Sequence, residues 1–66
     1  MKLKTLITKI EGNTNIRILK RGFAKDDDIL LYSGDVIKAI HKTKHHSKNV
    51  ESVAVDNNIL IVYVGD

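Results

Sequence analysis

The first apolar positions of the chain follow a helical spacing. The positions i, i+3, i+4 and i+7 are occupied by Leu3, Leu6, Ile7 and Ile10. Side chains at this spacing lie on one face of an α-helix, with Thr5 as a candidate N-cap and Gly12 as a candidate stop. We therefore expect a short helix over about residues 4–11. A β-strand stays open as the alternative, because the segment is short and rich in Thr and Ile.

Two short apolar runs follow, and both are typical of strands. Residues 16–20 (IRILK) alternate, and residues 29–32 (ILLY) form an apolar run between polar residues. A polar connection joins them, so we expect an antiparallel hairpin with a long loop. Ser33-Gly34 is a candidate turn, and Asp35 is a candidate N-cap for a second helix. That helix places Val36, Ile37 and Ile40 on one face with Ala39 beside them, and it fades near residues 45–47.

The last part of the chain carries the clearest pattern. Two apolar strands, 50–55 and 59–64, flank Asp56-Asn57-Asn58. Asn tolerates the left-handed conformation that a two-residue type I′ turn requires at both central positions, so Asn57-Asn58 is the predicted loop. The resulting register pairs Val55 with Leu60, Ala54 with Ile61, Val53 with Val62, Ser52 with Tyr63 and Glu51 with Val64.

The predicted elements give a single α+β domain spanning residues 1–66. Its order is α-β-β-α-β-β: a short helix, two antiparallel strands, a second helix and a C-terminal β-hairpin. We expect one small antiparallel sheet with the helices packed on it. Nothing in the chain marks a domain boundary or an internal repeat.

Both faces of the predicted C-terminal hairpin are apolar, which a sheet solvated on one side does not need. One face, expected to be core, holds Val53, Val55, Leu60, Val62 and Val64. The other is interrupted only by Ser52 and Asp56, and it holds Ala54, Ile59, Ile61 and Tyr63. If the helices split between the two faces, everything is buried within one chain. If both helices cover the same face, the second is a candidate interface for a second copy or for another partner.

Length and composition bear on that choice. A chain of 66 residues buries only roughly 60% of its unfolded surface, so its core is small. Without cysteine it has no disulfide to stabilise it, and self-association is the simplest remaining source of buried apolar area. We therefore expect a homodimer. No apolar run reaches the ~20 residues of a membrane span, and the start of the chain does not resemble a secretory signal, so we expect no membrane partner and a cytoplasmic location.

Candidate catalytic and metal-binding groups are sparse. The chain has no glycine-rich phosphate loop and no nucleophile elbow, and we expect no enzyme activity and no cofactor. His41 and His45 are four residues apart on the predicted helix, with His46 adjacent, but a third ligand is missing. We therefore favour the interpretation that the three histidines belong to a solvated polar face of the helix. The run of aspartates at 26–28 lacks the spacing of a calcium loop.

Basic residues fall into two clusters within a net charge of +3. The first holds Arg17, Lys20 and Arg21, and the second holds Lys38, Lys42, Lys44, His45, His46 and Lys48. Such clusters can contact phosphates or an acidic protein, although solvated faces of this kind are common. One Phe, two Tyr and no Trp offer few platforms for stacked bases.

Four segments resemble small hypothetical proteins encoded by phages and prophages of Gram-positive bacteria. They are residues 3–10 (LKTLITKI), 12–18 (GNTNIRI), 31–36 (LYSGDV) and 53–64 (VAVDNNILIVYV). The basic stretch 42–49 is longer than the connection those proteins are expected to have. The resemblance implies no catalytic residues and a host-cell location. It also implies stoichiometric binding to a host macromolecule, with inhibition of a defence system such as CRISPR as one form. The alternative is a small nucleic-acid-binding protein that uses the two basic clusters.

Overall fold

The computed structural model describes residues 1–22, 28–42 and 47–65. Within these ranges two helices and four strands follow the predicted order α-β-β-α-β-β. Their bounds are α1 Leu3–Ile7, β1 Asn15–Lys20, β2 Ile29–Asp35, α2 Val36–Lys42, β3 Asn49–Asp56 and β4 Ile59–Gly65. The α+β class is confirmed.

The sheet is mixed, so the expectation of an antiparallel sheet was only partly right. Its strand order is β2-β1-β4-β3, and the central pair β1 and β4 is parallel. The β1–β2 and β3–β4 hairpins are antiparallel as expected. β4 is apolar from Ile59 to Val64, so the central position buries it better than an edge would. The chain runs from β2 through α2 and β3 before it forms β4. This connection brings β4 beside β1 in the same direction, so the two strands pair in parallel.

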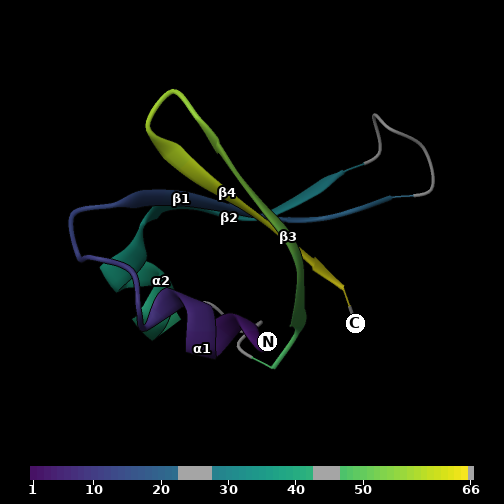
Figure 1. Ribbon diagram of the computed structural model, residues 1–66, viewed down its shortest axis with the longest axis horizontal. Helices are drawn as coiled ribbons and strands as arrows, with labels where there is room; N and C mark the ends of the chain where they lie inside the picture. Colours follow the sequence, from purple (N-terminus) through teal and green to yellow (C-terminus); the bar gives the residue numbers. More distant parts are fainter. Residues whose placement is uncertain (23–27, 43–46, 66) are drawn as a thin grey trace.

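Both helices lie on the same side of the sheet (Figure 1). The core lies between them and the central strands, and its side chains have no exposed surface. It consists of Leu3, Ile7, Ile16, Ile18, Val36, Ala39, Val62 and Val64. The alternative in which the helices split between the two faces is therefore wrong, and the second face of the sheet is left without a helix.

α1 is a helix, as the spacing predicted, but it is shorter than residues 4–11. It ends at Ile7, and the Thr8 hydroxyl donates to the carbonyl oxygens of Lys4 and Thr5 at 2.9 and 3.1 Å. The N-cap is Lys2 without a side-chain hydrogen bond, so the Thr5 cap was wrong. The start of the chain is tied to the start of β3, because the Leu3 amide donates to the Lys48 carbonyl at 2.8 Å.

Asp35 caps α2 as predicted, and its Oδ1 accepts from the Lys38 amide at 2.8 Å. The predicted turn at Ser33-Gly34 is wrong, since β2 continues to Asp35. Val36 and Ala39 are buried and Ile40 is half-buried, but Ile37 is 50% exposed. Ile37 reaches instead over Gly12, where a Cβ would meet its Cδ1 at 2.8 Å.

The β3–β4 hairpin turns at Asn57-Asn58, with φ of 52° and 65° at the two asparagines. These are the left-handed values that the predicted type I′ turn requires. The predicted pairs from Val55–Leu60 to Ser52–Tyr63 are confirmed. The pair Glu51–Val64 is wrong, because a bulge shifts the register and Val64 pairs with Val50. Bulges of this kind are common at sheet edges.

The predicted core face of the hairpin is only partly buried. Val62 and Val64 are buried and Leu60 is half-buried, but Val53 and Val55 are 47% and 71% exposed. β3 is an edge strand, and its hairpin end extends away from the helices (Figure 1). The helices therefore cover β1 and β4 and leave these two valines in solvent.

Candidate binding surfaces

The face of the sheet without a helix is the first candidate surface, and we call it the uncovered face. Side chains alternate between faces along a strand, so the neighbours of the buried residues Ile16, Ile18, Val62 and Val64 point to it. β1 contributes Arg17 and Leu19. The predicted interface residues all belong to it, with Ile59, Ile61 and Tyr63 half-buried on β4 and Ala54 exposed on β3.

The strand registers place these residues in rows across the uncovered face. Arg17, Ile61 and Ala54 lie in one row, because Ile61 pairs with both of the others. In the next row, Tyr63 pairs with Leu19 and with Ser52. β4 therefore forms an apolar centre with β1 on one side and β3 on the other.

Arg21 lies across Tyr63 on this face. Its guanidinium carbon is 4.5 Å from the ring centroid, and its Nη2 donates to the Ser52 hydroxyl at 3.0 Å. A guanidinium at this distance is attracted by the ring's quadrupole, by about 0.5–1 kcal/mol at an exposed site. Arginine and tyrosine are also enriched among the residues that carry most of the energy of protein interfaces.

The sheet separates the basic residues that the sequence grouped together. Arg17 and Arg21 point to the uncovered face, whereas Lys20 pairs with Val64 and belongs to the helix side. Lys38 and Lys42 are exposed on α2, and Lys48 precedes β3 and is half-buried. The first predicted cluster is therefore divided between the two faces of the sheet. Lys44, His45 and His46 lie outside the described residues.

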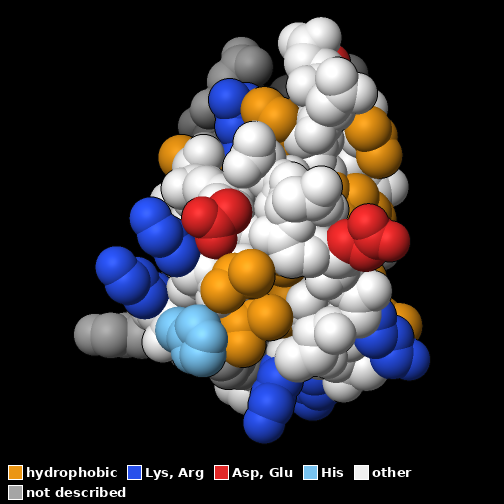
Figure 2. Space-filling model, turned by 90° about the vertical axis from the view of Figure 1, so that its left-hand side faces the viewer, with side chains coloured by type: hydrophobic (Ala, Val, Ile, Leu, Met, Phe, Trp, Pro, Cys, Tyr) orange, Lys and Arg blue, Asp and Glu red, His pale blue; other side chains and the backbone are white. Residues whose placement is uncertain are grey.

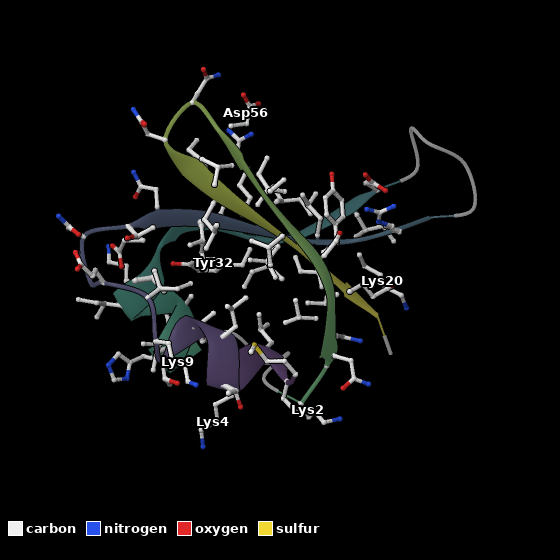
Figure 3. All side chains as sticks on the ribbon, viewed as in Figure 1. Lys2, Lys4, Lys9, Lys20, Tyr32 and Asp56 are labelled. Carbon is white, nitrogen blue, oxygen red and sulfur yellow. The ribbon has the colours of Figure 1, made fainter. Side chains whose placement is uncertain are left out.

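The helix side carries the second candidate surface, and part of it was missed by the sequence analysis. Lys2, Lys4 and Lys9 point away from the sheet (Figure 3) and are exposed. Lys38 and Lys42 are exposed on α2, which packs against α1. We call these five residues the helix-layer lysines. Figure 2 shows most of the lysines and arginines of that view over the lower half of the molecule, where the helices lie.

Acidic residues are absent from the two helices. Residues 1–10 and 36–42 contain no Asp or Glu, and the exposed Glu11 follows the first of these ranges. Asp35 precedes α2, and its carboxylate accepts the hydrogen bond that caps the helix. Lysines that outnumber carboxylates on the helix side produce a positive potential there, and this potential attracts acidic partners.

Tyr32 lies between the sheet and the helices (Figure 3). Its hydroxyl donates to the Asp35 carbonyl oxygen at 2.7 Å. Burial, and secondarily the charge of Asp35, raise the pKa of Tyr32 above its ordinary value. Its position and its hydrogen bond give Tyr32 a structural role.

The described part of the chain holds no group of three potential metal ligands among its His, Cys, Asp and Glu residues. His41 is exposed on α2. Asp28 is exposed as well, while Asp26 and Asp27 lie outside the described residues. No helix in residues 1–22, 28–42 and 47–65 is long and apolar enough to cross a membrane.

Comparisons with protein-family models, with curated proteins and with solved structures found no match.

Proposed function

We propose that this chain is a non-catalytic binding protein that acts by stoichiometric binding to a host macromolecule. The observation that carries the proposal is the separation of charge: the helix layer presents five lysines, and its described border carries two carboxylates, Glu11 and the capping Asp35. A surface of this kind attracts a partner with an acidic surface and speeds its association. The partner we propose is an acidic protein surface of the host.

The resemblance to small phage and prophage proteins supports a biological setting for this binding. Phage proteins of this size commonly act by occupying a surface of a host component. A host defence complex, such as a CRISPR effector, is one component that a phage-encoded binder would target. In this setting the protein works in the host-cell cytoplasm.

The proposal is tested by affinity capture from host lysate, with identification of bound proteins by mass spectrometry. Replacing Lys4 and Lys38 by Glu should abolish capture of the specific partner, because the positive potential is lost there. The matched control is Val53→Glu with Val55→Glu, which adds carboxylates at the exposed end of β3, away from the helices. Capture that survives in the lysine variant, or is lost equally in the control, contradicts the proposal.

A nucleic acid is the second candidate partner, and the same charge separation favours it. Lysines contact phosphates as point charges without reading sequence. Contact with a short labelled DNA or RNA duplex should then weaken steeply with salt, with a slope of about −0.9 per phosphate contacted. Each Lys→Glu change in the helix layer should reduce that slope by about 1. Binding to duplexes that is unaffected by salt and by these changes excludes this candidate.

A further inference from the structure

Charged residues on the uncovered face are sorted by the strand that carries their backbone, although the Arg21 guanidinium reaches over Tyr63 to Ser52 on β3. Arg17 on β1 and Arg21 just after it are both basic. On β3 the two charged residues are Asp56, which pairs with Ile59, and Glu51, whose carboxyl group lies over Gly65. The apolar side chains of β4 lie between the basic strand and the acidic strand.

This arrangement is complementary to a second copy of itself. A two-fold axis parallel to β4 would place two uncovered faces against each other, with β1 of each copy over β3 of the other. Arg21 follows Lys20, which pairs with Val64, so its backbone is level with Gly65 and with Glu51 of the second copy. In the dimer its guanidinium leaves Tyr63 and Ser52 of its own chain and turns to that carboxylate. Arg17 is one row from Asp56 of the second copy, within the reach of its long side chain. Each interaction occurs twice, as in any isologous interface.

The opposite choice of axis is electrostatically unfavourable. A two-fold axis across the strands would place β1 over β1 and β3 over β3, bringing basic residues to basic and acidic to acidic. Like charges placed together at an interface are strongly disfavoured. Charge therefore selects the axis parallel to β4. In that arrangement Ala54, which is exposed, lies opposite Arg17 of the second copy, because both residues are in the row of Ile61. Its small side chain leaves room for the close approach of stacked sheets.

The size of the chain gives an independent reason for a second copy. The described core consists of eight fully buried residues, and the chain contains no cysteine for a disulfide. Chains of this size commonly gain stability by association. Half-buried Ile59, Ile61 and Tyr63 would lose their remaining contact with water in such a dimer.

We infer that the uncovered face binds a second copy of this chain, in a two-fold dimer whose axis runs parallel to β4. Arg17 and Arg21 of one copy face Asp56 and Glu51 of the other. Both helix layers then point outward and stay accessible. The inference goes beyond the proposed function and uses different residues, so either can fail without the other.

The experiment uses two variants, each of which reverses the charges on one side of the uncovered face. One variant, Arg17→Glu with Arg21→Glu, has acidic residues on both strands, and the other, Glu51→Lys with Asp56→Lys, has basic residues on both. Sedimentation velocity at low ionic strength should show the wild type forming dimers as its concentration rises. Each variant alone should dimerise more weakly by over about tenfold, because like charges now meet. Mixing the two variants should restore a dimer, since each acidic strand then meets a basic one.

Three results would overturn the inference. The first is a wild type that stays monomeric throughout the concentration series. The second is that each variant dimerises as tightly as the wild type. The third is a mixture that stays monomeric although both variants have the wild-type circular dichroism spectrum.

A second pair of variants controls for a folding defect. Ala54→Lys places a charge on the uncovered face at an exposed position, and it should abolish dimerisation. Val55→Lys, on the other side of the same strand and 71% exposed, should leave dimerisation unchanged.

Discussion

Tyr32 and Gly34 form a small interdependent unit beneath the sheet. Gly34 has a φ of 152°, which side chains rarely permit, and a Cβ there would lie 2.9 Å from the Tyr32 hydroxyl oxygen. That hydroxyl donates to the Asp35 carbonyl oxygen just before α2. The glycine thus leaves room for the phenol to tie the end of β2 to the start of the helix.

The raised pKa of Tyr32 predicts that stability falls in alkaline solution. The folded chain holds the phenol proton to higher pH than the unfolded chain, whose tyrosine titrates near ~10. Above that pH the unfolded state binds fewer protons, so the free energy of unfolding decreases as pH rises. Urea unfolding at pH 8 and pH 11 measures the fall, which should be smaller in Tyr32→Phe.

The matched control at pH 8 is Tyr63→Phe, which removes a tyrosine hydroxyl but leaves the hydrogen bond from Tyr32 to Asp35 intact. At pH 8, Tyr32→Phe should cost about 0.5–1.5 kcal/mol for the lost hydrogen bond. An identical alkaline fall in wild type and Tyr32→Phe contradicts the assignment.

At the scale of elements, the β3–β4 hairpin depends on two asparagines with positive φ. Replacing Asn58, at φ 65°, by Ala should lower the free energy of unfolding by about 1–2 kcal/mol, because a Cβ without a compensating polar group disfavours this conformation. Asn58→Gly should be neutral or stabilising, since Asn-Gly is a preferred type I′ pair. Chemical denaturation measures both.

Asn13→Ala provides the control, because Asn13 is exposed in a turn and is not among the described residues with positive φ. It should change stability little. If Asn58→Ala and Asn13→Ala behave alike, the left-handed turn is not what stabilises the hairpin.

The elements were predictable where local chemistry determines them. Asn57-Asn58 can form a type I′ turn without help from the rest of the chain, and Asp35 caps α2 with its own side chain. The bulge at Glu51 was not predictable, because it depends on how β3 begins beside the start of the chain. The parallel pairing of β1 with β4 also escaped prediction, since it depends on which edge of the first hairpin receives the second.

At the scale of the whole molecule, the candidate surfaces were predictable only in part. Strand alternation identified Ala54, Ile59, Ile61 and Tyr63 as one face, which the register confirms. It could not identify Arg21 as the side chain lying over Tyr63, because that contact depends on the pairing of β1 with β4. The lysines in and beside α1 (Lys2, Lys4 and Lys9) were missed as a surface, because only tertiary packing brings them onto the same layer as the lysines of α2.

Both helices cover one face of the sheet, and we propose that the other face binds a second copy. Thiol labelling distinguishes the two faces directly, because the wild type contains no cysteine. Ala54→Cys places a thiol on the uncovered face, and Ala39→Cys places one in the buried core, with nearly the same change in volume. We expect the Ala54→Cys thiol to react rapidly in dilute solution and to become protected as the protein concentration rises, while the Ala39→Cys thiol stays protected throughout. An Ala54→Cys thiol that is protected even at high dilution, or one that stays equally reactive at every concentration, would contradict it.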